Sequence, residues 1–370
     1  MTRLQELFAS YGQSPWIDNI RRDWLNDGTL ARLVASGVRG VTSNPSIFAK
    51  ALATSSAYDE LVRAAGDVDA EELFEELAVA DVRDACDVLG DVHERSRVDF
   101  AREERRYCDG FVSLEVSPRL ARDTGATIVG ARRLAAKVDR ANAMIKIPAT
   151  REGLPAVREV LGAGINVNVT LIFSLERYDE VITAWMDGLD LAMANGHDVR
   201  GIASVASFFV SRVDAAVDAL LGEGDPRRGT IANAQVAGAY QLYRERIAGE
   251  RASALLNLGA QVQRPLWAST STKNPTYYDL LYVDTIVADE TVNTMPDATL
   301  EAVLDHGEFA ASLLRDAASV DAAASALASL PPEVSLDDVT ARLERDGVQA
   351  FVDSYEELLA TVETKIAGAR

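Results

Sequence analysis

Residues 144–150 read Met-Ile-Lys-Ile-Pro-Ala-Thr, a short apolar run that holds a single lysine, Lys146. Hydrophobic residues stand on both sides of this lysine between Val138 and Pro148, as is typical of a buried strand. A charged ammonium among apolar groups loses hydration worth several kcal/mol unless it is paired or deprotonated. The lysine therefore either reaches water at the strand end or is kept in this setting for its chemistry.

Similar short apolar runs recur along the 370-residue chain, with amphipathic stretches such as Leu175–Ala194 between them. Alternation of strands and helices predicts parallel pairing, and eight such units predict a closed (β/α)₈ TIM barrel. An open doubly wound sheet is the alternative architecture. The eight candidate strands are Trp16–Ile20, Gly40–Thr42, Phe111–Val116, Ala143–Pro148, Ile165–Phe173, Gly201–Phe209, Pro265–Ser269 and Leu280–Val287.

Two regions exceed a minimal barrel. Residues 55–108 are long enough for two or more helices after the second strand, and residues 298–370 hold two further helical patterns that meet near Pro331-Pro332. We interpret both regions as decorations with extra helices, so residues 1–370 are expected to form a single α/β barrel domain.

Composition narrows the class of protein. Hydrophobic residues make up 48% of the chain, enough for a large core, and the formal net charge is −20. This charge disfavours nucleic acid as a partner, but a few local cations suffice for one small phosphorylated substrate. Two cysteines without metal-like spacing, no membrane-length apolar run and no secretory signal at the N-terminus predict a cytoplasmic protein without membrane attachment.

Polar residues stand at the ends of the candidate strands, where the active site of a (β/α)₈ barrel is found. They come from seven of the eight runs and are expected to meet at one mouth of the barrel. In chain order they are Asp18, Thr42, Ser43, Asn44, Glu115, Lys146, Asn168, Thr170, Ser207, Arg212, Ser269 and Lys273.

Each of these residues also has a purely structural interpretation. Asn44 precedes Pro45 and would cap a helix, and Asp18 would cap a helix or pair with a cation. Glu115 and Lys146 would form a structural ion pair, or Lys146 would extend its amine to solvent. Asn168 and Thr170 share one strand face and would serve packing, while Arg212 would be a surface cation on a helix.

The lysine also has a clear chemical use. Burial lowers the pKa of an amine, which makes the neutral nucleophile available near neutral pH, and such an amine adds to a ketone to form a Schiff base. The protonated imine accepts the electron pair of a neighbouring carbon–carbon bond, so a retro-aldol step becomes feasible. Asp18 would take the hydroxyl proton, and Glu115 with a water held by Thr170 would relay protons during dehydration. This chemistry requires neither a metal nor an organic cofactor.

Two segments resemble the signatures of the transaldolase family. "GVTSNPSIF" (40–48) is similar to the family's Thr-Ser/Thr-Asn-Pro-Ser segment, and "MIKIPATREG" (144–153) is similar to the segment around its Schiff-base lysine. "GINVNVTLIFS" (164–174) and "ASFFVSRVD" (206–214) match the strands that follow, and "NTMP" (293–296) is also familiar. The resemblance covers roughly residues 14–290, and the chain exceeds the shorter family members in length, so it resembles the longer bacterial branch.

The resemblance implies transfer of a dihydroxyacetone unit from sedoheptulose 7-phosphate to glyceraldehyde 3-phosphate in the pentose phosphate pathway, giving erythrose 4-phosphate and fructose 6-phosphate. It assigns Lys146 as the nucleophile, Asp18 as the acid/base, and Glu115 with Thr170 as the holders of the relay water. It further implies that substrate is bound by Thr42, Asn44, Asn168, Ser207, Phe209, Arg212 and Ser269.

One departure from the family pattern concerns the phosphate. Many members carry Ser-Phe-Arg after the seventh strand, whereas this chain reads Ala268-Ser269-Thr270-Ser271-Thr272-Lys273. Lys273 is the expected replacement cation, although a lysine binds phosphate as a point charge without the bidentate fork of arginine.

Two other functions stay open at this point. A fructose 6-phosphate aldolase would use the same lysine and release free dihydroxyacetone, but the apolar Phe209 favours transfer because it assists water less than a tyrosine would. A barrel that binds sugar phosphates or a protein partner without turnover would never form an imine at Lys146. The sequence also leaves a homo-oligomer open.

Overall fold

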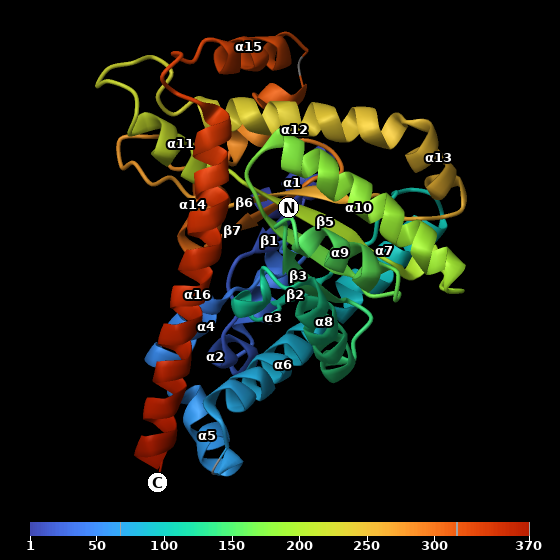
Figure 1. The fold of residues 1–370 in the computed structure, drawn as a ribbon, viewed down its shortest axis with the longest axis vertical. Helices are drawn as coiled ribbons and strands as arrows, with labels where there is room; N and C mark the ends of the chain where they lie inside the picture. Colours follow the sequence, from blue (N-terminus) through green and yellow to red (C-terminus); the bar gives the residue numbers. More distant parts are fainter. Residues whose placement is uncertain (67, 316, 370) are drawn as a thin grey trace.

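The computed structural model describes residues 1–66, 68–315 and 317–369. Its centre is a parallel sheet of seven strands in the order β1-β7-β6-β5-β4-β3-β2 (Figure 1). Each strand therefore pairs with its neighbour in sequence, apart from β1, which pairs with β7. The strands are β1 (Ser14–Ile17), β2 (Val112–Glu115), β3 (Ala143–Pro148), β4 (Val167–Ile172), β5 (Ser204–Phe209), β6 (Arg264–Ala268) and β7 (Val292–Met295).

Val41 closes this sheet into a barrel. It pairs in parallel with Ile17 of β1 on one side and with Val112 of β2 on the other. The Val41 N–H donates to the carbonyl of Phe111 at 2.9 Å, and the Thr42 N–H donates to the carbonyl of Ile17 at 2.9 Å. The predicted second strand is thus reduced to one bridging residue, and the (β/α)₈ barrel is confirmed over the open sheet.

The prediction of the last strand was wrong. The buried run Leu280–Val287 is a turn followed by the short 3₁₀ helix η4 (Asp284–Ile286), which packs against helix α12 (Ile231–Ala248). A short apolar run does not by itself distinguish a strand from other buried backbone. The strand that completes the barrel is β7, in which the polar Asn293 accepts a hydrogen bond from Thr270 at 2.9 Å. The first strand also begins earlier than predicted, at Ser14.

Helices follow the strands around the outside of the barrel (Figure 1). Side chains at their N-termini explain where several begin: the Ser174 hydroxyl accepts from the Arg177 N–H at 3.1 Å, and the Asp123 carboxylate accepts from the Ala126 N–H at 2.9 Å. These helices are α1 (Arg3–Tyr11), α2 (Arg22–Asn26), α3 (Thr29–Ser36), α4 (Pro45–Thr54), α8 (Thr124–Val138), α9 (Gly153–Leu161), α10 (Leu175–Ala194), α11 (Ser211–Asp218), α12, α13 (Glu250–Asn257) and α14 (Asp297–His306).

The two additional regions are helical. The first contains η1 (Ser56–Tyr58), α5 (Asp59–Ala65), α6 (Ala70–Val88) and α7 (Gly90–Ala101), and the second contains η5 (Leu313–Arg315), α15 (Ala317–Ala328) and α16 (Leu336–Ala369). Helix α6 packs against β2 and α8, while α16 packs against α4, α6 and α11. We infer that both regions decorate a single barrel domain, because their helices pack directly on barrel elements. The remaining 3₁₀ helices are η2 (Pro118–Leu120) and η3 (Val199–Gly201).

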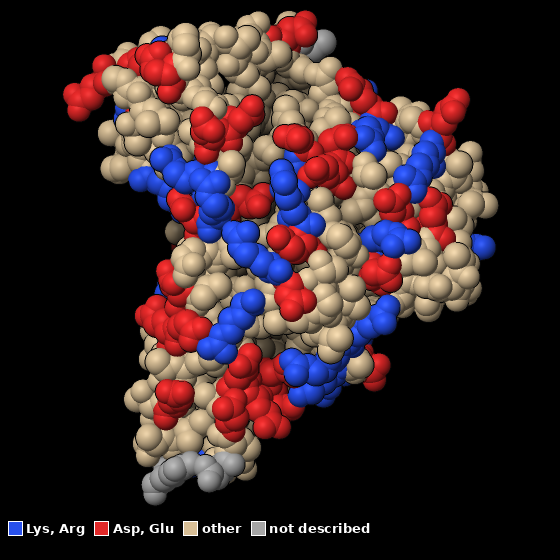
Figure 2. Space-filling model, in the orientation of Figure 1, with Lys and Arg blue, Asp and Glu red and all other residues tan. Residues whose placement is uncertain are grey.

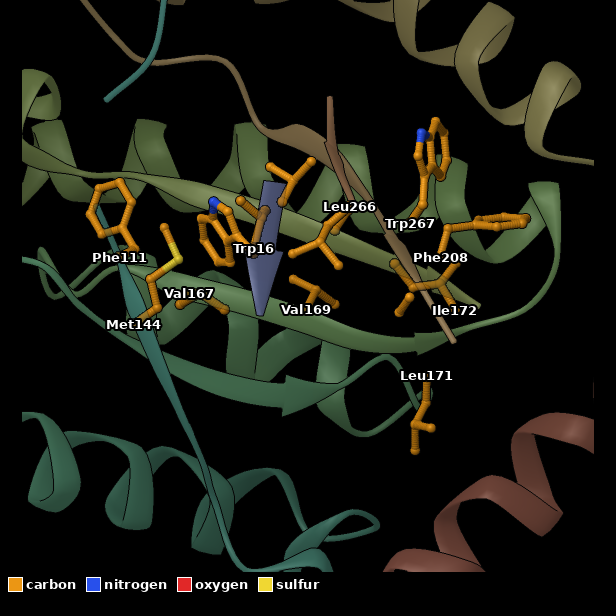
Figure 3. Packing of buried hydrophobic residues seen from close by; sticks show 14 of the residues in the cluster. Trp16, Phe111, Met144, Val167, Val169, Leu171, Ile172, Phe208, Leu266 and Trp267 are labelled. Carbon is orange, nitrogen blue, oxygen red and sulfur yellow. The ribbon is translucent and has the colours of Figure 1, made fainter. Parts of the chain in front are cut away.

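The core lies inside the barrel and between the sheet and its helices. Trp16, Phe208 and Trp267 have no exposed surface, and Figure 3 shows them with Phe111, Met144 and Leu266 around the strands. Every residue of β3, β4, β5 and β6 is buried. Strands that are buried on both faces read as continuous apolar runs, which is why most of them were visible in the sequence.

A buried ion cluster lies where the strands begin, at the end of the barrel opposite to Lys146. Asp109, fully buried, accepts from Arg39 at 2.9 Å, from the indole N–H of Trp16 at 3.0 Å and from Arg264 at 3.2 Å, as well as from Ser14. The Arg264 guanidinium, itself 1% exposed, lies 4.1 Å from the ring centroid of Tyr107. We call Asp109, Arg264, Arg39, Ser14 and Trp16 the floor cluster.

The surface carries charges of both signs close together. On the face seen in Figure 2, basic side chains lie among acidic ones. Many of them are paired, such as Arg119 with Glu356 at 2.8 Å and Lys137 with Glu76 at 2.6 Å. In the described part of the chain, no helix is both long and apolar enough to cross a membrane.

Candidate active site

Strand register places the lysine beside two polar neighbours. Lys146 of β3 lies opposite Glu115 of β2 and Asn168 of β4, and Pro148 lies opposite Thr170. The side chains of Lys146 and Glu115 are 5% and 3% exposed. Glu115 is the last residue of its strand, so the pair stands near the C-terminal end of the barrel, as expected for the site of such a fold.

The amine of Lys146 is held by three groups. Its Nζ lies 3.5 Å from Oε2 of Glu115 and donates a hydrogen bond to the carbonyl oxygen of Ser43 at 3.1 Å. It also lies 5.7 Å from the ring centroid of Phe351, a residue of α16. The amine therefore does not extend to solvent, and the snorkelling interpretation is wrong.

Asp18 follows β1 and is oriented by a chain of hydroxyl groups. Thr42 donates to Oδ1 of Asp18 at 2.6 Å, so the 2.7 Å contact between Thr42 and Thr294 has Thr294 as the donor. Burial raises the pKa of Asp18 above its ordinary value, while Lys146 and the Thr42 hydrogen bond act in the opposite direction. The structure thus brings Asp18 into the electrostatic neighbourhood of Lys146.

Glu115 is poorly satisfied for a buried carboxyl group. Apart from its ion pair with Lys146, neither of its oxygens has a hydrogen-bond partner within the described residues, and the same holds for the Thr170 hydroxyl. Burial raises the pKa of Glu115 to about 7, against the opposing effect of Lys146. A carboxyl group with this pKa can both give and take a proton near neutral pH.

Asn168 is hydrogen-bonded to two hydroxyl groups. Its amide nitrogen donates to Ser113 at 3.0 Å, and its carbonyl oxygen accepts from Ser207 at 2.7 Å. All three side chains are buried. This network fixes the Asn168 amide on the same level of the barrel as Lys146.

Two cations, Arg212 and Lys273, interact electrostatically with each other and with Asp18. Burial lowers the pKa of Arg212, and burial together with the nearby Arg212 lowers the pKa of Lys273. Asp18 acts in the opposite direction on both groups. The Arg212 guanidinium lies 5.4 Å from the ring centroid of Phe209, which also contacts Phe173, and Lys273 donates to Ser271 at 2.9 Å.

Ser269 directly follows β6 in an uncommon backbone conformation, with φ of +56°. It is held there by Ser211, the first residue of α11, through a 3.0 Å contact of the two hydroxyl groups and a backbone hydrogen bond of 3.0 Å. Non-glycine residues in this region are enriched at functional sites, where surrounding contacts stabilise them. Ser269 thus joins the β6 end to the helix that carries Arg212.

Asn44 has the structural role that its position before a proline suggested. It is the N-cap of α4, and its side chain accepts from the Ile47 N–H at 3.1 Å. The cap uses the carbonyl oxygen of the side-chain amide. Asn44 thus lies two residues after Thr42 on the same loop.

Comparison with known proteins identifies the family. A sequence model described as transaldolase/fructose-6-phosphate aldolase matches residues 15–362. The chain belongs to this family. It is 48% identical to proteins named transaldolase from Frankia alni, over 98% of this chain and 97% of the relative, and from Saccharopolyspora erythraea, over 99% and 98%. It is also 48% identical to the transaldolase of Thiobacillus denitrificans, over 95% of this chain and 97% of the relative.

Three groups at the site were not among the site residues predicted from the sequence. The Ser43 carbonyl is a backbone group, so residue type gives no signal for it. Thr294 lies in a strand that was not predicted, within a segment whose only signal was its similarity to the family. Phe351 comes from a helix far along the chain, and no local pattern connects it to Lys146.

Within the described residues, no group of three or more His, Cys, Asp or Glu side chains is arranged to hold a metal ion.

Proposed function

We propose that this protein is a transaldolase that moves a dihydroxyacetone unit from sedoheptulose 7-phosphate to glyceraldehyde 3-phosphate. The products are erythrose 4-phosphate and fructose 6-phosphate. The observation that carries the proposal is the buried amine of Lys146, 3.5 Å from Glu115 and electrostatically coupled to Asp18, in a chain of this family. As part of the same proposal, the enzyme works in the cytosol on small sugar phosphates.

The first step is imine formation at Lys146. The Nζ adds to the ketone carbon of the donor sugar, and the resulting carbinolamine loses its hydroxyl group as water. Glu115 is assigned the proton transfers of this step, through a water molecule that it would hold together with the Thr170 hydroxyl. The pKa of Glu115 near 7 and the unsatisfied oxygens of both residues support this role.

The second step is carbon–carbon cleavage with Asp18 as the base. Asp18 takes the proton of the hydroxyl group next to the bond that breaks, the aldehyde product leaves, and the bonding electron pair moves into the iminium to form an enamine. A carboxylate whose pKa is raised by burial is a stronger base than one in water. Reversal of this step on the acceptor aldehyde forms the new bond.

The other polar groups would bind the substrate. Thr42, Asn44, Asn168 and Ser207 are assigned to the sugar hydroxyls, and Phe209 forms an apolar wall. Arg212 and Lys273, with Ser269 between their segments, are assigned to the phosphate. The closeness of the two cations supports this assignment, because an anion would relieve their mutual repulsion.

The decisive experiment traps the imine. The protein is incubated with fructose 6-phosphate, reduced with borohydride and digested, and the peptides are read by mass spectrometry. We expect a covalent three-carbon adduct on Lys146 and none in Lys146→Ala, which should lose transfer activity to background. The control Lys137→Ala removes a surface lysine that pairs with Glu76 and should keep both adduct and activity.

Two outcomes would contradict the proposal. Absence of the adduct together with full activity in Lys146→Ala would exclude Schiff-base catalysis at this residue. Rapid release of dihydroxyacetone from fructose 6-phosphate without an acceptor would instead identify a fructose 6-phosphate aldolase.

A further inference from the structure

Helix α16 lies across the segments that follow the barrel strands. It contacts β4, η2 after β2, α4 after the Val41 bridge and α11 after β5. In Figure 1 it runs as one long red helix past the barrel toward α5. All four of these segments border the end of the barrel that holds Lys146. A helix from the second additional region is therefore part of the surroundings of the candidate site.

A glycine allows this helix to approach the barrel closely. A Cβ atom at Gly347 would lie 3.2 Å from Leu171 and 3.5 Å from Phe173, at the end of β4. Leu171 is itself held at a φ of +59°, at the register shift between Val169 and Ile172. The end of β4 and the glycine of α16 thus fit each other at short distance.

Polar contacts fix the rotation of α16 beyond this point. Ser46 of α4 donates to Ser354 at 2.8 Å, and Tyr355 donates to Glu71 of α6 at 2.9 Å. The Tyr355 ring also packs against Phe74, with centroids 5.8 Å apart. These contacts come from two different elements, so the face of α16 that carries Phe351 has a defined direction.

Phe351 stands one helical turn after Gly347 and faces the lysine. Its side chain is buried, with 5% of the residue exposed, and its ring centroid lies 5.7 Å from Nζ of Lys146. Glu115 and the Ser43 carbonyl contact the same amine from the barrel. Phe351 thus contacts the amine from outside the barrel. Its ring has no group that donates or accepts a proton.

We propose that Phe351 is a specificity-determining residue that directs the covalent intermediate to an aldehyde acceptor instead of to water. The inference rests on the proposed function. After cleavage, the three-carbon unit is bound to Lys146 as an enamine. Its loss requires that the enamine carbon takes a proton and that water then adds to the iminium carbon to form a carbinolamine. Collapse of the carbinolamine breaks the carbon–nitrogen bond and frees dihydroxyacetone and the amine.

Transfer uses the same enamine carbon differently. That carbon forms a bond to the aldehyde carbon of the acceptor, and the aldehyde oxygen takes a proton from Asp18. Water then hydrolyses the new iminium, which releases the product sugar and the free amine of Lys146. The ring of Phe351 covers the nitrogen side of the intermediate and keeps bulk water from it until the acceptor arrives. Exclusion of water from an active site is a general means of suppressing hydrolysis of a reactive intermediate.

The test compares two products of one reaction. Fructose 6-phosphate is supplied with erythrose 4-phosphate, and free dihydroxyacetone and sedoheptulose 7-phosphate are both quantified. Phe351→Ala should raise the ratio of released dihydroxyacetone to transfer product by about tenfold. Phe351→Leu, which keeps an apolar cover of smaller size, should raise it by about twofold.

A control on the same helix distinguishes exclusion of water by Phe351 from a general loss of packing of α16. Leu358 is fully buried and stands two turns further along α16. Leu358→Ala should lower the urea concentration at the midpoint of unfolding and leave the product ratio unchanged. If Phe351→Ala does not fold, Phe351→Leu carries the test, and a wild-type ratio in that variant overturns the inference.

The result also separates this inference from the proposed function. A wild-type protein that forms neither adduct nor transfer product overturns the proposed function, and the inference with it. A wild-type protein that transfers, with a Phe351→Ala variant that folds and keeps the same product ratio, overturns the inference alone.

Discussion

The two ends of the barrel both bury charged side chains, but they satisfy them differently. In the floor cluster, Asp109 accepts hydrogen bonds on both carboxylate oxygens, from two arginines, a serine and a tryptophan. At the mouth, Glu115 has Lys146 at 3.5 Å, and its oxygens otherwise lack hydrogen-bond partners within the described residues. The buried carboxyl group thus has several hydrogen-bond partners at the floor and very few at the mouth.

The difference appears in the proton affinity of the two carboxyl groups. Burial opposes ionisation of Asp109, but Arg264, Arg39 and the Ser14 hydrogen bond outweigh it, so its pKa is lowered. Burial raises the pKa of Glu115 to about 7, and Lys146 only partly offsets it. The positive charges and hydrogen bonds that stabilise the ionised form thus outweigh burial at Asp109 but not at Glu115.

The largest expected effect concerns turnover at the mouth. Asp18→Ala should lower turnover by roughly 10²–10⁴-fold, the usual range for the loss of a general acid–base group. The imine at Lys146 should still form, since Asp18 is assigned to the cleavage step. Steady-state kinetics and borohydride trapping measure the two effects separately.

A surface carboxylate provides the control for this variant. Asp23→Ala, which removes a half-exposed partner of Arg21, should leave turnover unchanged. Normal turnover in Asp18→Ala would show that its assigned role is wrong.

The next effect concerns the stability of the floor. Asp109→Asn should lower the free energy of unfolding by about 3–5 kcal/mol, because it leaves Arg264 buried without its counter-charge. Turnover per folded molecule should stay at the wild-type value, since the floor lies at the opposite end of the barrel. Urea denaturation measures the first quantity and an activity assay on folded protein the second.

The matched control is Asp87→Asn, which removes an exposed partner of Arg140 and should change stability by less than about 0.5 kcal/mol. Equal stability losses in the two variants would mean that the floor cluster is no more important than a surface ion pair.

The smallest effect is a pH dependence of stability with opposite sign at the two ends. The unfolded chain releases the Glu115 proton near its ordinary value of 4.5, whereas the folded protein keeps it until about 7. Between these values the folded state binds more protons, so the free energy of unfolding falls as the pH rises. Glu115→Gln removes the contribution of this proton to the pH dependence of stability. When the pH is raised from about 5 to about 8, the free energy of unfolding of the variant should therefore rise by about 1–3 kcal/mol relative to that of the wild type.

Asp109 should behave in the reverse manner. Its pKa is lowered in the folded protein, so its contribution to stability is present above its ordinary value of 3.8 and is lost as the pH falls below that value. Denaturation curves over a pH series measure both trends. Parallel pH profiles for wild type and Glu115→Gln would refute the contrast between the two ends.

The fold was largely predictable because its strands are buried on both faces. The predicted run Ala143–Pro148 coincides with β3, and the runs of β4, β5 and β6 were found to within a few residues. Strand β7 escaped prediction because Asn293 and Thr294 make it polar, while the predicted run Leu280–Val287 forms a turn and the 3₁₀ helix η4, which packs against α12. Hydrophobicity reports burial, and burial alone does not specify a strand.

The site was predictable where local pattern determines position. Strand ends carry Glu115 and Asp18, and register then places Glu115 beside Lys146. The helix-capping geometry of Asn44 was also foreseen as an alternative to a binding role. Phe351 was beyond reach, because its position depends on the docking of a distant helix onto β4 and α4, a tertiary contact with no local signature.

Helix α16 has a consequence for the order in which the protein is completed. Every strand of the barrel, and with them Lys146, Glu115 and Asp18, precedes Leu336 in the chain. During synthesis, which proceeds from the N-terminus, the barrel can assemble before the helix that bears Phe351 has emerged. Lys146 is therefore in place before Phe351, and in a nascent barrel the side of this lysine that Phe351 contacts would face water until the final helix docks.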